Sequence, residues 1–220
     1  MKNLNRFLEQ TILNPLTTDQ DIDRMVSEAK KYQFRGVCVS PFWVKKTKRE
    51  LMDTDIQVVT VVGFPLGFQM TETKVFETEQ AIKNGADEID VVWSLTSFKS
   101  GMNWPKIELA KLSQVCHDQE KLLKVIIETA YLEEKEIIQA CEICSDAGVD
   151  FVKTSTGLGP EGARIDHVRL MRKTLPSQVG IKASGGIKTL AQTLDLIKAG
   201  ADIIGTSSGV AIMEENALHP

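Results

Sequence analysis

Three charged side chains stand where short apolar strands are expected to be buried. Asp90 lies in the segment EIDVV, Lys153 ends the segment DFVK, and Lys182 ends the segment VGIK. A lysine amine attacks a carbonyl carbon only as the free base, which a nearby cation and partial desolvation favour. The resulting iminium can accept electrons from a breaking carbon–carbon bond, while a carboxylate moves protons. These three residues therefore predict catalysis by an amine.

Structural explanations for these charges also exist. A lone lysine at a strand end is often the first solvated residue of a loop, and ion pairs can be purely structural inside a barrel. We interpret Lys124 and Glu128, which bracket the segment KVIIE, as supporting residues of that kind. Two lysines on neighbouring strands together with an aspartate on a third favour a catalytic set.

Two glycine-rich loops predict a phosphate site. The loop ASGGI spans residues 183–187, and GTSSGV spans 205–210 and opens a short helix. Backbone N–H groups and hydroxyls at a helix start attract anions, and barrel enzymes often bind phosphate in the last two loops. Either loop alone could be a plain turn or N-cap. The candidate phosphate-binding residues are Gly185, Gly186, Gly205, Ser207 and Ser208, with Thr156 and Gly157 from the loop after Lys153.

Short apolar strands alternate with amphipathic helices along the chain. The expected strands are 11–13 (weak), 36–39, 58–62, 88–92, 122–127, 150–153, 179–182 and 202–205, and clear helical patterns cover 19–32, 71–84, 133–147 and 189–199. Gly85, Gly148 and Gly200 each follow a helix, where a left-handed cap is favoured. Eight strand–helix units predict a TIM (β/α)8 barrel, here with an additional short N-terminal helix. The rival is an open doubly wound sheet, but no G-x-G-x-x-G follows the first strand.

Composition narrows the function classes. The chain has 220 residues and a formal net charge of -4, which argues against a nucleic-acid partner. No segment divides it, so we expect one domain over residues 1–220. The N-terminus lacks the apolar run of a signal peptide, and no stretch is long enough to span a membrane. A cytoplasmic protein is therefore expected.

The four cysteines do not predict a redox or metal site. Cys141 and Cys144 form a C-x-x-C, but the surrounding text is typical of a helix interior, so buried helix cysteines are expected. The three histidines are scattered, which disfavours a zinc site. We expect no metal and no cofactor.

The motifs together resemble the deoxyribose-phosphate aldolase family over nearly the whole chain. The matching segments are VGFPLG, EIDVV, LLKVIIET, DFVKTSTG, VGIKASGGIKT and IGTSSGV. The resemblance implies reversible cleavage of 2-deoxy-D-ribose 5-phosphate to D-glyceraldehyde 3-phosphate and acetaldehyde, in deoxyribonucleotide catabolism. It places Lys153 on the Schiff-base lysine, Lys182 on the second lysine and Asp90 on the proton-relay aspartate. It also places six of the seven loop residues, all except Thr156, on phosphate-contacting positions.

Four positions depart from the family pattern. Glu9 replaces an aspartate and Asn14 a lysine, while Ser94 and Thr96 replace an asparagine and a glycine. These differences leave the amine chemistry intact but leave the aldehyde and sugar preference open. Two other functions stay open: another phosphosugar barrel enzyme, of transaldolase or isomerase type, and a barrel that only binds a sugar phosphate. A small phosphosugar is the expected partner, and a homo-oligomer (dimer or tetramer) stays open.

Overall fold

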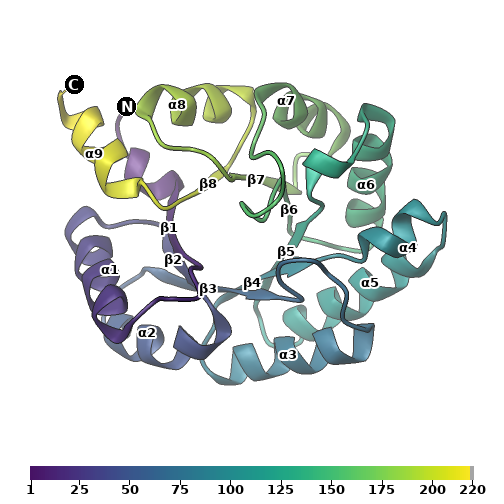
Figure 1. Cartoon of the computed structure of the whole chain (residues 1–220), viewed down its shortest axis with the longest axis horizontal. Coiled ribbons are helices and arrows are strands. Elements are labelled where there is room, and N and C mark those ends of the chain that lie inside the picture. The colour runs from purple at the N-terminus through teal and green to yellow at the C-terminus, as the bar shows by residue number, and fades with distance from the viewer. Residues whose placement is uncertain (219–220) are drawn as a thin grey trace.

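Eight parallel strands close into one barrel in the computed structural model, paired in chain order, with helices around the outside (Figure 1). The structure describes residues 1–218; residues 219 and 220, which the single-domain prediction includes, lie outside that part. The strands are β1 (Leu8–Ile12), β2 (Gly36–Val39), β3 (Gln57–Val62), β4 (Glu88–Val92), β5 (Leu122–Ile126), β6 (Phe151–Lys153), β7 (Gly180–Ser184) and β8 (Ile203–Thr206). The TIM-barrel prediction is confirmed.

Helices follow the strands and cover the barrel. They are α1 (Asp19–Tyr32), α2 (Val44–Leu51), α3 (Thr71–Lys83), α4 (Leu95–Lys99), α5 (Trp104–His117), α6 (Glu134–Asp146), α7 (Ile165–Thr174), α8 (Leu190–Ala199) and α9 (Gly209–Leu218), with 3-10 turns η1 (Leu4–Phe7), η2 (Pro41–Trp43) and η3 (Thr129–Tyr131). The expected short N-terminal helix is the single 3-10 turn η1. No helix within residues 1–218 is long and apolar enough to cross a lipid bilayer.

Local sequence signals set the helix ends. Thr18 and Asp21 form a reciprocal capping box at the start of α1, which satisfies two backbone donors. Gly200 ends α8 with φ at 114°, a left-handed conformation that a Cβ disfavours. Gly85 and Gly148 also have positive φ, as the repeated glycine signature predicts. Each cap turns the chain back into the next strand.

Strand β1 begins earlier than the sequence pattern indicates. The expected strand covered 11–13, whereas β1 spans Leu8–Ile12 and pairs with both β2 and β8. Glu9 is the reason, because a charge within a strand breaks the apolar pattern used to find it. In the structure Glu9 is fully buried and lies opposite Gly36 and Gly205, where other buried charges compensate it.

The cysteines pack as expected from the sequence. Cys38, Cys116, Cys141 and Cys144 are all buried and free, with Cys141 and Cys144 inside α6. The main hydrophobic core lies between the barrel and its helices, as Val152, Ile181 and Ile204 illustrate. The barrel interior, in contrast, contains buried charged side chains from several strands, and these side chains define the candidate site.

Candidate active site

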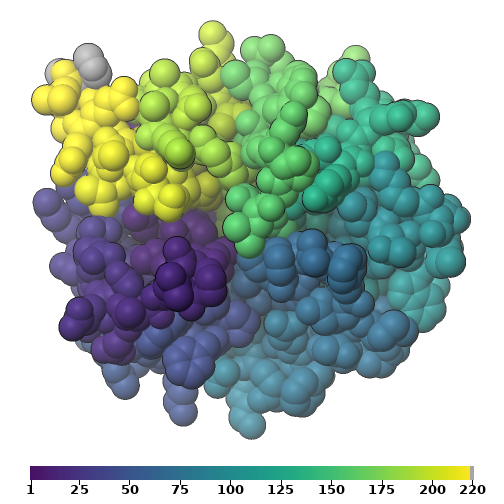
Figure 2. Space-filling view, in the orientation of Figure 1, coloured from purple at the N-terminus to yellow at the C-terminus, as the bar shows by residue number. Residues whose placement is uncertain are grey.

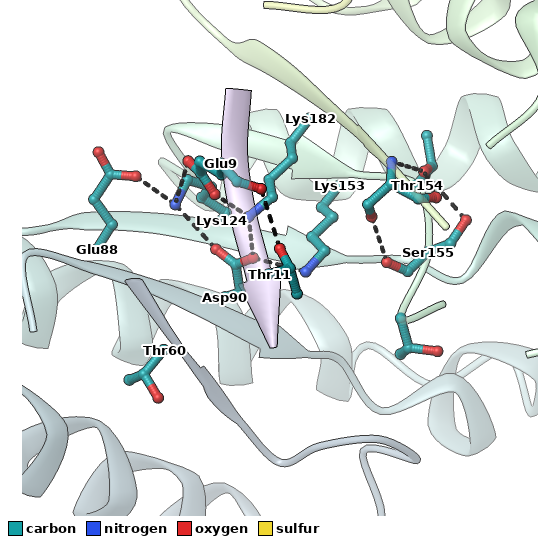
Figure 3. A network of polar contacts seen from close by, with 12 residues as sticks. Glu9, Thr11, Thr60, Glu88, Asp90, Lys124, Lys153, Thr154, Ser155 and Lys182 are labelled. Atoms are coloured by element: carbon teal, nitrogen blue, oxygen red, sulfur yellow. Dashed lines mark hydrogen bonds and ion pairs between the residues drawn. The ribbon is translucent and has the colours of Figure 1, made fainter. Parts of the chain in front are cut away.

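Seven charged side chains form one connected group inside the barrel, which we call the charge network. Figure 3 shows the members around Asp90. The centre of the network is Asp90, whose Oδ2 accepts hydrogen bonds from the Nζ atoms of Lys153 at 2.7 Å and Lys182 at 2.6 Å. The Nζ of Lys124 lies 3.0 Å from the other Asp90 oxygen, Oδ1. Its members are Glu9, Arg35, Glu88, Asp90, Lys124, Lys153 and Lys182.

Strand register brings these residues together. Lys153 on β6 lies opposite Lys182 on β7, and Asp90 on β4 lies opposite Lys124 on β5. Side chains alternate along a strand, so this register points all four into the same interior. The sequence prediction that the two lysines and Asp90 lie close together therefore matches the geometry. Lys124 joins them as a direct contact of Asp90.

Mutual attraction decides the ionisation of the network. Burial alone would raise the pKa of Asp90, but Lys124, Lys153 and Lys182 hold that pKa well below its ordinary value. Burial alone would lower the pKa of Lys182, but Asp90 and Glu9 raise it above its ordinary value. The pKa of Lys124 is raised by the same competition. Near neutral pH, Asp90 is therefore an anion, while Lys124 and Lys182 are cations.

Lys153 is the network member that lines a cavity at the C-terminal end of the strands. This cavity, which we call the lysine cleft, has a volume of about 350 Å³. Its walls include most of the predicted phosphate-binding residues: Thr156, Gly157, Gly185, Gly186, Gly205 and Ser207. Asn14 lines it too, so one of the four departures from the family pattern faces this space.

Two backbone N–H groups at the start of α9 already donate hydrogen bonds to other residues of the chain. The Ser208 N–H donates to Thr206 Oγ1 at 2.9 Å, and the Gly209 N–H donates to Gln10 Oε1 at 2.9 Å. Ser207 lines the lysine cleft, whereas Ser208 does not. Of the two serines predicted to bind phosphate, Ser207 is therefore the better placed.

Gly205 has a second role that its loop sequence does not reveal. A Cβ at this position would lie 3.0 Å from the Lys182 Cε and 3.1 Å from the Ser184 Cβ. The bare backbone therefore leaves room for the Lys182 stem on its way to Asp90. A larger residue here would displace a charge of the network.

A second cavity opens beside the lysine cleft. It has a volume of about 400 Å³ and apolar walls that include Leu66, Phe68 and Trp93, with Thr96 also in its lining. Thr156 and Leu158 line both cavities. In Figure 2 the green loop that carries them stands between the purple N-terminal segment and the blue segment after β3. This loop therefore divides the mouth of the barrel.

Glu128 holds the dividing loop rather than the charge network. Its Oε2 accepts hydrogen bonds from the Thr156 N–H at 3.1 Å and from the Thr156 hydroxyl. Glu128 itself has a left-handed backbone, with φ at 50°. Glu128 is thus a supporting residue, but it acts through hydrogen bonds to Thr156 and not through the structural ion pair expected from the sequence.

Three charged residues were missed by the sequence analysis. Glu88 lies two residues before Asp90, so the two-residue period of a strand could have placed it inside the barrel. Lys188 lines the lysine cleft and follows the Gly185–Gly186 pair closely, which was a usable signal. Arg35 precedes β2 and gave no such signal. Within residues 1–218, no group of three or more His, Cys, Asp and Glu side chains is arranged to hold a metal ion.

Comparisons with known proteins agree on one family. The model of the DeoC/LacD family of aldolases matches residues 6–215. A deoxyribose-phosphate aldolase of Thermococcus kodakarensis is 46% identical over 216 residues, which cover 97% of this chain and 96% of the relative. The solved structure of QR15, an aldolase, superposes with a TM-score of 0.94 at 38% identity, covering 100% of this chain and 98% of that chain.

A third relative is described as an assembly. The deoxyribose phosphate aldolase of Aeropyrum pernix, described as a unique tetrameric structure, superposes with a TM-score of 0.91 at 30% identity. The match covers 99% of this chain and 92% of that chain. The fold of this chain is thus shared over its full length with solved aldolases.

The charge network predicts a specific loss of stability in acid. Lys124 and Arg35 outweigh burial and lower the pKa of Glu88 from 4.5 to about 2. A carboxyl whose pKa is depressed by folding stabilises the protein above its unfolded pKa, and the contribution is lost as pH falls towards the folded value. We expect the free energy of unfolding to fall more steeply between about pH 4.5 and pH 2 in the wild type than in Glu88→Gln.

Urea unfolding at a series of pH values measures this slope. Glu72→Gln, which removes an exposed carboxylate from α3, should keep the wild-type slope. If Glu88→Gln keeps it as well, the ion pairs of Glu88 do not stabilise the fold in the way the structure indicates.

Proposed function

Since the chain belongs to the DeoC/LacD family of aldolases, we propose that it cleaves 2-deoxy-D-ribose 5-phosphate reversibly to D-glyceraldehyde 3-phosphate and acetaldehyde. The observation that carries the proposal is the position of Lys153. Its amine contacts Asp90 beside Lys182, and its side chain lines a cleft whose far walls are the glycine loops. A barrel that only binds a sugar phosphate needs no such amine.

The proposed reaction begins at Lys153. Its free amine attacks C1 of the open-chain sugar, water leaves, and an iminium forms. The electrons of the C2–C3 bond then move into the iminium, while the hydroxyl on C3 loses its proton and becomes the aldehyde of glyceraldehyde 3-phosphate. The remaining enamine takes a proton at C2, and hydrolysis releases acetaldehyde and restores the amine.

Lys182 and Asp90 are proposed to serve the proton transfers. Lys182 carries a proton and shares Asp90 Oδ2 with Lys153, so the three groups form a short path for a proton beside the reacting carbon. Because the pKa of Asp90 is low, its carboxylate stays ionised near neutral pH. It therefore accepts hydrogen bonds from both amines in the resting enzyme. The positive charge of Lys182 also disfavours a second proton on its neighbour.

The phosphate of the substrate is proposed to bind on the far side of the lysine cleft. Gly185 and Gly186 have positive φ, with values of 88° and 74°, which exposes their backbone towards the cleft. Exposed Lys188 adds a cation there, and Ser207 adds a hydroxyl. Binding energy from this remote group can then be used at the reacting carbon. Thr156, Gly157, Gly205 and Ser208 complete the proposed set.

We also propose that the chain forms a homo-oligomer through the faces of α3 and α5. Phe68, Met70, Met102 and Trp104 line one surface hollow there, and Phe76 on α3 is 61% exposed. Exposed apolar side chains gathered in one place mark association surfaces. The tetrameric relative from Aeropyrum pernix supports assembly.

We further propose that residues 1–220 form one domain and that the protein is located in the cytoplasm, where free thiols are usual.

The first prediction from this proposed function is a covalent adduct on Lys153. Borohydride added during turnover of deoxyribose 5-phosphate should reduce the imine to a stable amine, located by peptide mapping. A coupled assay should detect acetaldehyde and triose phosphate, and a chelator should leave the rate unchanged because the imine, not a metal, accepts the electrons. Label on another residue would overturn the assignment. Turnover of a phosphosugar without acetaldehyde release would favour an isomerase.

The second prediction locates the phosphate. Lys188→Ala and Ser207→Ala should each lower kcat/KM for deoxyribose 5-phosphate by about 10- to 100-fold, because each removes a contact to a charged group. Neither variant should change kcat/KM for unphosphorylated deoxyribose. The control is Lys198→Ala, an exposed lysine of α8 outside the cleft. Equal losses with both sugars would place the phosphate elsewhere.

The third prediction concerns assembly. Light scattering should give a mass of two or four times the 24.4 kDa monomer. Phe76→Lys should lower that mass because a charge would enter the apolar contact. Phe42→Ser, which removes an 82% exposed aromatic ring from η2, serves as the control. A monomeric wild type, or unchanged assembly of Phe76→Lys, would contradict this use of the α3–α5 face.

A further inference from the structure

The charge network includes every charged residue of the eight strands. The strands contribute Glu9, Glu88, Asp90, Lys124, Lys153 and Lys182, and Arg35 joins from the position before β2. Six of these side chains are at most 3% exposed, and Arg35 is 18% exposed. The network is therefore a closed electrostatic unit with little contact with solvent.

The contacts run continuously from one end of the network to the other. Arg35 lies 2.6 Å from a Glu9 oxygen and 2.7 Å from a Glu88 oxygen. Lys124 lies 2.5 Å from Glu88 and 3.0 Å from Asp90. The amines that serve the chemistry are thus linked through Asp90 to a second layer of charges farther from the cleft.

Counting the charges shows an imbalance. With every group ionised, four cations face three carboxylates, so the buried unit would carry one excess positive charge. An uncompensated charge in a protein interior is costly, and such groups change protonation state instead. Loss of a single proton leaves three cations and three anions. The network is therefore best balanced when one of its bases is neutral.

The number of carboxylate partners shows which base gives up the proton. Arg35 cannot, because a guanidinium stays protonated in proteins. Lys124 has three carboxylates within 4 Å, and Lys182 has two, Glu9 and Asp90. Lys153 has one, Asp90, and shares that oxygen with Lys182. Lys153, which lines the lysine cleft, is thus the base with the fewest carboxylate partners.

We propose that Arg35, Glu88 and Lys124 are positioning residues that set the charge count of the network and thereby keep Lys153 as a free amine. The inference rests on the proposed function, since Lys153 is taken to form the imine. It differs from the role of Lys182 alone, because groups that touch neither substrate nor Lys153 are expected to govern the pH range of imine formation.

The other groups facing the network leave this count unchanged. Burial raises the pKa of the Cys38 thiol on β2 to about 11, so it is uncharged near neutral pH. Strands β3 and β8 contribute no titratable side chain. Glu128 follows β5 but bonds to Thr156. The raised pKa values of Arg35 and Lys124 agree with their remaining charged.

Opposite substitutions should move imine formation in opposite directions. The experiment measures the rate of reductive trapping of acetaldehyde on Lys153 with cyanoborohydride across pH. Lys124→Met removes a cation, so charge balance no longer favours a neutral amine, and the midpoint of the pH profile should move up by about one pH unit, a tenfold change in the dissociation constant. Glu88→Gln removes an anion and should move the midpoint down. The double variant should return close to the wild type.

Controls separate charge from packing. Lys124→Arg keeps the charge and should keep the wild-type midpoint, as should Lys106→Met, which removes a partly exposed lysine of α5 that pairs with Asp146 outside the network. Should Lys124→Met fail to fold, the more exposed Arg35 carries the test, with Arg35→Gln expected to move the midpoint up and Arg35→Lys to leave it in place.

Two results would overturn the inference. Midpoints that stay fixed in the charge-changing variants, or that move in the same direction for Lys124→Met and Glu88→Gln, would make these residues merely structural. Absence of any label on Lys153 in the wild type is a different outcome, since it would refute the proposed function itself.

Discussion

One buried carboxylate, that of Asp90, holds the centre of this barrel together. Three lysine amines from β5, β6 and β7 converge on its two oxygens. Without that anion, three ammonium groups would repel one another in an interior where charges interact strongly. The same carboxylate therefore stabilises the fold and fixes the distance between the amines that are proposed to react. Stability and chemistry depend on one interaction.

This arrangement requires a closed barrel with a fixed register. The contacts of Glu9 and Lys182 join the first and seventh strands, which are 173 residues apart in the chain. Only closure through β8 brings them together. A shift of one residue in any of these strands would turn its charge towards the helices and bury it without a partner. The charges thus add to the specificity of strand pairing.

The sequence predicted the later seven strands and placed Lys153 at the end of β6, whereas Lys182 lies in the middle of β7 and does not end it. The predicted first strand, 11–13, begins too late because the charge of Glu9 interrupts the apolar pattern that indicates a strand. Glu88 shares its side of β4 with Asp90 and could have been found from the two-residue period. The roles of Arg35 and Gly205 could not, because they depend on atoms of other strands. Likewise, the division of the barrel mouth by the loop carrying Thr156 is a property of three-dimensional packing alone.

Buried ion pairs are often replaceable by apolar side chains without loss of stability, so the network needs a reason beyond folding. Substrate binding supplies one. A phosphate dianion at the proposed site around Gly185 and Ser207 would add negative potential to the cleft and favour a proton on Lys153. A network in which four bases share only three carboxylates opposes that effect, and Lys188 weakens it further by neutralising part of the phosphate charge. The shortage of one carboxylate beneath the cleft is thus the condition under which the proposed anionic substrate and an uncharged amine could occupy the same site.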